Sequence, residues 1–213
     1  MARFSTGLAS LLAVFVITAA ASSLAAPTAA EEANAAALFK EGLQRREEGK
    51  TDAAILALRQ AHALAASPRP GLEAAKLLIA RGELLEAQDL LRQVVKLPEY
   101  RETAKTKAAR EEAAKLAQDL DGQIGSVRID VQGSLNGLTI LLDGVTFQHI
   151  MLGTPWRVNP RNHVIELRRG ELVLDRKEVT VGAGTSVDVH LELPKTQAPK
   201  AASTVSLTDP PSK

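Results

Sequence analysis

Two stretches of the chain match one another and decide the fold of its first half: "GKTDAAILALRQAHAL", residues 49–64, and "GELLEAQDLLRQVVKL", residues 82–97. Similar residues stand at a constant offset of 33 at five pairs of positions: Gly49 and Gly82, Ala54 and Ala87, Leu58 and Leu91, Ala61 and Val94, and Leu64 and Leu97. A repeat of this period is typical of solenoids built from helix hairpins. We therefore expect residues 31–121 to form an all-helical repeat domain.

A few small residues explain how one repeat unit would fold. Gly49 and Gly82 suit the tight turn between two antiparallel helices, because glycine adopts positive φ without a steric cost. Ala54 is small enough to let the two helices approach closely, and Leu58 lies one turn further along the same face. Residues 101–121 form a charged segment with a narrow apolar stripe, and we expect this helix to cap the repeat.

The helical half resembles the tetratricopeptide repeats, whose conserved small and apolar residues are matched at five positions: Leu38, Gly42, Ala54, Leu58 and Ala61. Ala35 and Arg45 stand where that family has aromatic residues, and the likeness covers two units. The resemblance implies a groove that binds a peptide or a partner helix.

From Gly122 onward, apolar residues recur at every second position, which is the period of β-strands. The alternating runs are "SVRIDV" at 126–131, "LTILLDG" at 138–144, "HVIEL" at 163–167, "LVLDRKEVTV" at 172–181 and "SVDVHLEL" at 186–193. Short strands at regular spacing favour a small all-β sandwich over residues 122–194. The expected fold class is thus α+β in two domains, with the helices first.

The second half also contains a series of turn residues: Asp143-Gly144, Gly153-Thr154-Pro155, Pro160 with His163 and Ile165, and Gly170. These residues resemble the PEGA family of small sandwich modules, which occur in bacterial envelope and multidomain proteins. Arg161 replaces the usual turn glycine, and Glu171 replaces an aromatic residue. The connection "VTFQHIML", residues 145–152, is longer than is typical for the family, and its role stays open.

One stretch, "GTPWRVNPRNHVIELRRG" at residues 153–170, has the composition of a site, since it holds the only Trp and a His. Trp156 and Val158 share one face of a short strand, so we expect Trp156 to be buried in the sandwich core. The alternative is an exposed Trp156 that stacks on a ligand. His163 lies beside the "NPRN" turn, and we expect it to be a buried residue that fixes this loop.

The N-terminus has the parts of a secretory signal peptide over residues 1–30: Arg3, an uncharged apolar run from Leu8, and small residues after it. Cleavage is expected after Ala25 or after Ala30, which would leave no stable membrane span. An uncleaved anchor is the alternative, because the apolar run is long enough to cross a bilayer. The other end, residues 195–213, lacks periodicity and is rich in Pro, Ser, Thr and Lys, which predicts a disordered tail.

Composition and motifs argue against several functional classes. The 26 basic and 25 acidic residues give a net charge of +1, whereas nucleic-acid binding needs an excess of clustered Lys and Arg. The chain has no cysteine, so disulfides and thiolate sites are excluded. Motifs for a nucleophile elbow, a phosphate-binding loop or a zinc protease are missing. The four histidines, at 62, 149, 163 and 190, show no metal-site spacing. We expect no catalytic, metal or cofactor site.

These features favour a non-enzymatic interaction protein, exported to the periplasm or cell envelope, that binds a protein or peptide through its helical groove. The residues of that binding surface cannot be chosen from the sequence. The alternative is a structural or glycan-binding envelope protein whose β-sandwich contacts a cell-wall polymer. Sugar binding relies on aromatic residues, and Phe147, Trp156 and Tyr100 are the aromatic residues outside the leader and the first helix.

Overall fold

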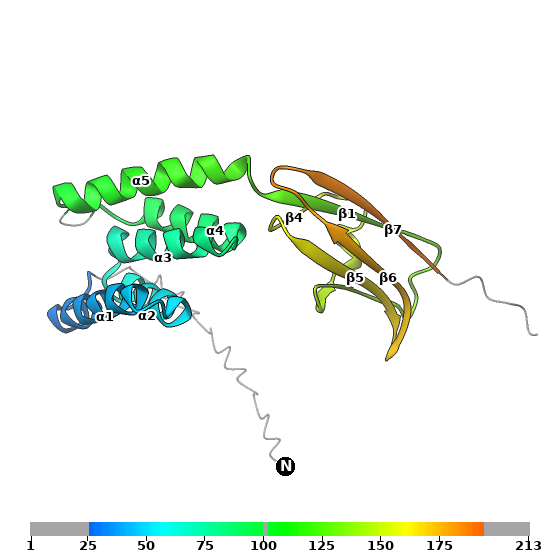
Figure 1. Cartoon of the computed structure of the whole chain (residues 1–213), viewed down its shortest axis with the longest axis horizontal. Coiled ribbons are helices and arrows are strands. Elements are labelled where there is room, and N and C mark those ends of the chain that lie inside the picture. Colours follow the sequence, from blue (N-terminus) through cyan, green and yellow to red (C-terminus); the bar gives the residue numbers. More distant parts are fainter. Residues whose placement is uncertain (1–25, 100–101, 194–213) are drawn as a thin grey trace, which may run out of the picture.

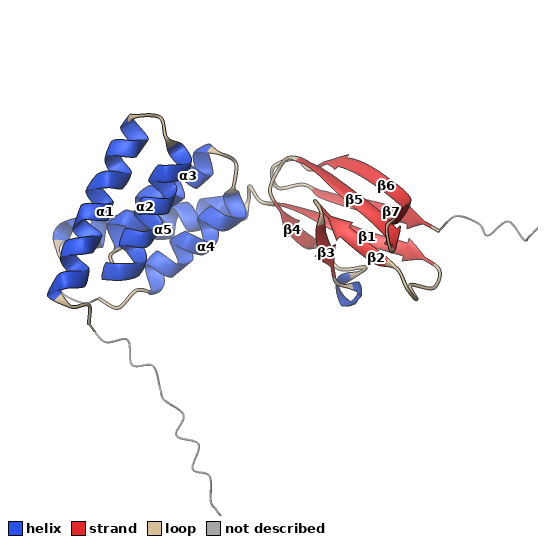
Figure 2. Ribbon diagram, turned by 90° about the horizontal axis from the view of Figure 1, so that it is seen from below, coloured by secondary structure: helices blue, strands red, loops and turns tan. Residues whose placement is uncertain are grey.

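The computed structural model describes residues 26–99 and 102–193. Five helices are followed by seven strands in this part of the chain, which confirms the α+β layout in two domains (Figure 1, Figure 2). Residues 1–25 of the expected leader, Tyr100 and the expected tail lie outside the described residues. No helix within the described ranges is both long and apolar enough to span a bilayer.

The helical domain is a stack of two hairpins and a final helix (Figure 1). Its elements are α1 (Ala29–Glu47), α2 (Thr51–Ala65), α3 (Pro68–Ala80), α4 (Leu84–Lys96) and α5 (Ala104–Asp121). Gly49 with φ 74° and Gly82 with φ 78° form the turns inside the two hairpins, as the repeat predicts. Both turns need a left-handed backbone, which glycine adopts most easily.

The helices pack closely because small residues face large ones. Leu58 and Leu91, a matched pair of the repeat, are both fully buried. Gly42 of α1 approaches Leu58 so closely that a Cβ added there would lie 2.6 Å from the Leu58 Cγ. On α5 the apolar stripe is buried at Ala109, Ala113 and other positions, while the rest of the helix faces solvent. This helix packs through that stripe on the last helices of the stack, and its role as a cap stays a prediction.

The β domain consists of two sheets that share one apolar core. Its strands are β1 (Gly125–Gln132), β2 (Thr139–Leu142), β3 (Val145–Phe147), β4 (Trp156–Val158), β5 (Asn162–Arg169), β6 (Leu172–Thr180) and β7 (Ser186–Glu192). One sheet has the order β4-β1-β7, with β1 and β7 parallel, and the other has the antiparallel order β3-β2-β5-β6. Inward residues such as Val127 and Ile129 of one sheet meet Ile140 and Ile165 of the other.

The loop 145–152 contains structure that the strand pattern did not predict. Its first residues form β3, and His149–Met151 form a short 3-10 helix, η1. The preceding Asp143-Gly144 turn has positive φ at both residues, 52° and 80°, as expected for a type I′ hairpin turn. That geometry sends the chain directly back along β2, so the residues after the turn pair as a third strand.

The two domains keep separate apolar cores and meet through polar groups. Arg157 of β4 donates to the Oε1 of Gln88 on α4 at 2.7 Å. Gln88 is fully buried, and its amide donates in turn to the Ala117 carbonyl and to Asp121 on α5. Beside this network, Asn159 accepts a hydrogen bond from the backbone N–H of Leu85 at 2.9 Å.

The contact at Asn159 is a helix cap supplied by the other domain. Glu83, the N-cap residue of α4, makes no capping bond with its own side chain. The Asn159 side chain takes this role for Leu85, one of the first N–H groups of the helix, which have no partner within the helix. The turn after β4 thereby fixes the β domain against the start of α4.

Candidate functional site

A groove of about 510 Å³ runs along the face that α1, α3 and α5 share. Apolar side chains from all three helices line it: Phe39, Leu43, Leu72, Ala108 and Ala109. It is the surface in which the sequence-based interpretation expects a peptide or partner helix to bind.

The groove is a consequence of the repeat. Phe39, Leu72 and Lys105 stand at the same offset of 33 on α1, α3 and α5, and all three line the groove. Each helix therefore contributes a residue from the same position of its unit. Phe39 and Leu72 are apolar, whereas Lys105 adds a positive charge to the groove at the matching position of α5.

The rim of the groove contains both signs of charge. Arg46 pairs with Glu73 at 2.6 Å. Lys76, beside the groove, pairs with Glu112 at 2.8 Å and with Glu73 at 3.5 Å. Burial alone would lower the pKa of Lys76, but the bonds and charges of Glu112 and Glu73 outweigh burial and raise it. Both glutamates of the rim are thus neutralised within the protein.

Two other cations of the groove have no such partner. The Arg69 guanidinium lies over the Phe39 ring, 5.0 Å from its centroid, in a cation–π contact. Lys105 is exposed in the first turn of α5. Among the described residues, no carboxylate pairs with either side chain. The groove therefore combines an apolar floor with two unpaired positive charges.

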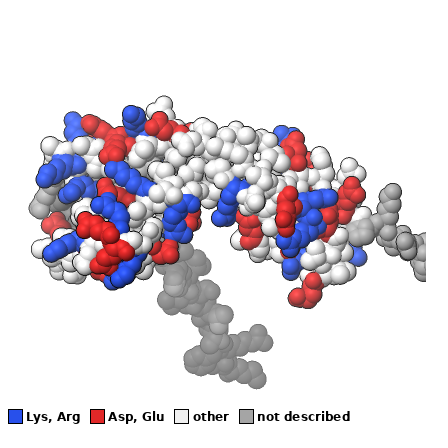
Figure 3. All heavy atoms as spheres, in the orientation of Figure 1, with Lys and Arg blue, Asp and Glu red and all other residues white. Residues whose placement is uncertain are grey.

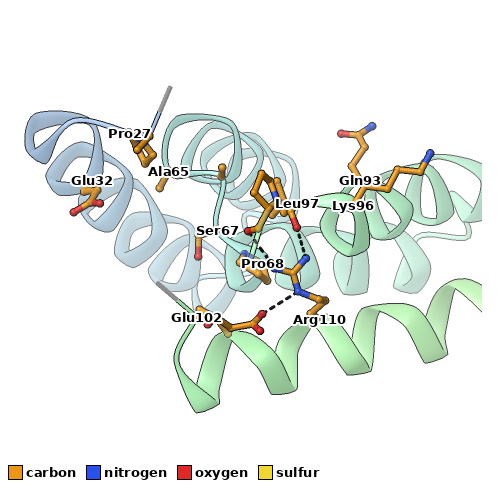
Figure 4. Close-up of a pocket in the computed structure, with 14 residues that line it drawn as sticks. Pro27, Glu32, Ala65, Ser67, Pro68, Gln93, Lys96, Leu97, Glu102 and Arg110 are labelled. Carbon is orange, nitrogen blue, oxygen red and sulfur yellow. Dashed lines mark hydrogen bonds and ion pairs between the residues drawn. The ribbon is translucent and has the colours of Figure 1, made fainter. Parts of the chain in front are cut away.

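A second hollow of about 450 Å³ lies between the start of α1, the α2–α3 turn and the end of α4 (Figure 4). Figure 4 shows Arg110 of α5 reaching from this hollow toward Leu97 and Glu102. Its guanidinium donates to the Leu97 carbonyl at 2.6 Å and pairs with Glu102 at 2.9 Å. Further bonds run from the same guanidinium to the Val95 and Pro98 carbonyls. Arg110 thus stabilises the end of α4.

The expectation that Trp156 is buried is wrong, since the residue is 41% exposed. Trp156 begins β4, a three-residue strand at the edge of its sheet. Its ring stands edge-on to Phe147 of β3, with 5.9 Å between the centroids. Trp156 pairs with the core residue Val127 and shares its face of the sheet, but it lies at the sheet edge, where its ring borders the buried Phe147 and stays partly exposed. Val158, two residues later, does reach the core.

His163 fixes a loop, as the sequence-based interpretation expects. The residue is 2% exposed, and its Nε2 lies 2.7 Å from the Asn159 carbonyl. Its Nδ1 lies 2.8 Å from Asp143 Oδ2. Burial alone would raise the pKa of Asp143, but hydrogen bonds from the Val164 N–H and His163 lower it below its ordinary value. Through Asn159, this pair also supports the residue that caps α4.

The remaining candidates of the sequence form no site. His62 is buried against the Ser67 carbonyl at 2.8 Å, while His149 and His190 are exposed. Within the described ranges, no group of three or more His, Asp or Glu residues could hold a metal ion. On the β5–β6 hairpin, Arg168 pairs with Glu166, and Arg176 pairs with Glu166 and Glu178, so this surface carries both signs of charge. Figure 3 shows the same mixture of charges over both domains.

Sequence reasoning expected a groove in the helical domain but chose none of its residues, the two cations included. The repeat offset points to Lys105, because this residue falls at the position of Phe39 and Leu72. Arg69 gives no such signal, since its contact with Phe39 depends on how α1 and α3 pack. A comparison with known protein-family models finds no match, and a comparison with curated proteins finds none either. The geometry of the chain itself therefore has to support a functional proposal.

Proposed function

We propose that this chain is a non-enzymatic interaction protein that binds a peptide or protein segment in the groove between α1, α3 and α5. One observation carries the proposal. Three helices of successive units present an apolar floor, with Phe39 and Leu72 on it, beneath a charged rim. Such a surface suits an extended or helical segment that buries apolar side chains and keeps its polar groups at the edges.

The finer family assignment belongs to the same proposal. The helical units are tetratricopeptide-like, and the β domain is a PEGA-like sandwich. Support for the first comes from the buried Gly42, Ala54 and Leu58, which occupy the positions where the resemblance is strongest. Support for the second comes from two sheets around one core and from the left-handed turn glycines Gly153 and Gly170. Export to the periplasm or envelope, with the leader removed, completes the proposal.

A second candidate function rests on Trp156. An exposed aromatic ring at a sheet edge is the kind of group that stacks on a sugar, so the β domain is a candidate surface for a cell-wall polymer. Val145 and Ile150 of the preceding loop are also exposed, at 70% and 86%. If this surface binds the polymer, Trp156→Ala will abolish co-sedimentation of the purified chain with isolated cell wall, and the groove variants below will not.

The main proposal is tested by photo-crosslinking at single positions in the native envelope. A photoreactive amino acid replaces Ala108, which is exposed in the groove, or Ala63, which is exposed on α2 away from it. We expect a discrete crosslinked product from position 108 and none from position 63. Products of equal yield from both positions, or no product from position 108, would contradict a groove-bound partner.

A further inference from the structure

We infer that the segment bound in the groove is acidic, with a carboxylate that pairs with Arg69 and Lys105. This inference rests on the proposed function and specifies its partner. Its first support is the distribution of charges on the rim. Glu73 and Glu112 are already neutralised by Arg46 and Lys76, as described above. The positive charges of Arg69 and Lys105 are left without a carboxylate among the described residues.

The second support is where these two cations lie on their helices. Each is the second residue of its helix, Arg69 in α3 and Lys105 in α5, and neither first turn contains an acidic residue. The N-terminal end of a helix carries a partial positive charge, so a cation there is unfavourable and an anion is favourable. By contrast, α1 has Glu31 and Glu32 in its first turn. A carboxylate from a partner would relieve this charge at both helix ends.

The third support is the way Arg69 is held. Its guanidinium carbon lies over the Phe39 ring, and its N–H groups are paired with no carboxylate among the described residues. A guanidinium edge binds a carboxylate through two parallel hydrogen bonds. Because the ring already restricts the side chain, less conformational entropy is lost when the carboxylate binds.

The groove also specifies what accompanies the acid. Its floor is apolar at Phe39 and Leu72, so the bound segment should place a large apolar side chain next to the acidic residue. A polyphosphate chain fits less well, because it has no apolar group to cover this floor. The favoured ligand is therefore a peptide with one or two acidic residues beside apolar ones.

The test begins with selection from a displayed library of random octapeptides on the immobilised whole chain. We expect Asp or Glu to be enriched next to an apolar residue. The most frequent peptide is then labelled with a fluorophore, and its affinity is measured by anisotropy. Lys105→Glu should weaken binding about tenfold or more, because it places a like charge opposite the acid. Arg69→Gln should also weaken it.

Lys107→Glu is the matched control, since Lys107 is exposed on the same helix but does not line the groove. It makes the same change in net charge and should alter affinity less than about threefold. A second variant, Ala108→Trp, fills the groove and keeps both cations in the chain. Circular dichroism of each variant establishes that the helices are intact.

The outcomes separate the inference from the function on which it rests. If Ala108→Trp blocks binding but the selected peptides show no preference for acidic residues, the inference is overturned and the groove remains the binding site. The same holds if Lys105→Glu and Lys107→Glu change the affinity equally. Peptides that are insensitive to Ala108→Trp contradict the groove itself. A library from which the whole chain selects no peptide contradicts both.

Discussion

The Nη2 of Arg157 lies 2.7 Å from the Oε1 of Gln88 and joins an edge strand of the β domain to a buried side chain of α4. The amide nitrogen of Gln88 donates to the Ala117 carbonyl and to Asp121, and these two bonds orient its Oε1 toward Arg157. Arg157 therefore completes the hydrogen bonds of a buried polar group that lies in the other domain. This network and the cap at Asn159 connect the two domains.

Removing Arg157 should loosen the joint between the domains. In Arg157→Ala the Gln88 Oε1 loses its partner in a buried position, at a cost of about 1–3 kcal/mol. Since the chain has no cysteine, two can be introduced for spin labels, at Ala63 and at Glu171. The distance distribution between the labels should be narrow in the parent and broad in Arg157→Ala. Arg169→Ala, which removes an exposed arginine of the same domain, should leave it narrow.

An equally broad distribution in the parent and in Arg157→Ala would show that the polar network does not fix the domains. Asn159→Ala offers an independent check, because it removes only the cap of α4. Loss of a helix cap costs about 0.5–2 kcal/mol of stability. Although Asn159 belongs to the β domain, its substitution should therefore lower the free energy of unfolding of the helical domain.

His62 should make the helical domain sensitive to mild acid. Burial lowers the pKa of His62 below its ordinary value of 6.5, and the hydrogen bond to the Ser67 carbonyl only partly opposes this. The unfolded chain therefore binds a proton more readily than the folded chain, and the free energy of unfolding falls as the pH drops below this value. Urea unfolding followed by helical circular dichroism should show a larger loss from about pH 7.5 to about pH 5.5 in the parent than in His62→Gln.

His190→Gln is the control for this pH effect, because His190 is exposed on β7 and should leave the pH dependence of the helical signal unchanged. If His62→Gln and the parent lose the same free energy over this range, His62 is not the group responsible.

Gly42 should be intolerant of a single added methyl group. Alanine normally stabilises a helix relative to glycine by about 1 kcal/mol. At position 42, however, the new Cβ would lie 2.6 Å from Leu58 Cγ and 2.8 Å from its Cδ2, and Leu58 is fully buried. We expect Gly42→Ala to lower the free energy of unfolding by about 1–3 kcal/mol, measured with urea.

Gly122→Ala provides the comparison, since φ is −84° there and an added Cβ meets no atom within 4 Å. Its effect should stay within about 0.5 kcal/mol. A Gly42→Ala protein as stable as Gly122→Ala would mean that α1 and α2 lie further apart than described.

The fluorescence of Trp156 should show that its ring is partly exposed at the edge of the β domain. With 41% of its surface exposed, the only Trp of the chain should emit at longer wavelength than a core Trp and be quenched by iodide. Trp156→Ala should leave the β domain folded. A truncation cost of about 3–5 kcal/mol applies to a fully buried core residue, and Trp156 is not one. Blue-shifted, unquenched emission together with unfolding of Trp156→Ala would place the ring in the core after all.

The sequence predicts the order of helices and strands well, and it fails where side chains from distant segments meet. The repeat at Gly49 and Gly82 predicts both hairpins, because turn chemistry and apolar spacing are local properties. Trp156 shares its alternation with Val158, but the pattern does not say that β4 stops at three residues on a sheet edge. The bond from Arg157 to Gln88 joins residues 69 apart in sequence, so no local pattern indicates it.

The groove follows the same division. Phe39 and Leu72 occupy matching positions in two units, but the repeat does not indicate that their helices enclose a groove. The charge state of its rim is not predicted either, because Arg46 and Lys76 are neutralised by pairing across helices while Arg69 lies over a ring. Only the packing of α1, α3 and α5 shows which cations remain available to a ligand.

The most direct measurement of the central claim is a map of amide chemical-shift changes when the selected acidic peptide is added to the isotope-labelled whole chain. The account predicts that the largest changes occur at the groove residues of α1, α3 and α5, including Phe39, Arg69 and Lys105. Changes concentrated around Arg110 and Leu97 in the second hollow, or around Trp156 in the β domain, would contradict it.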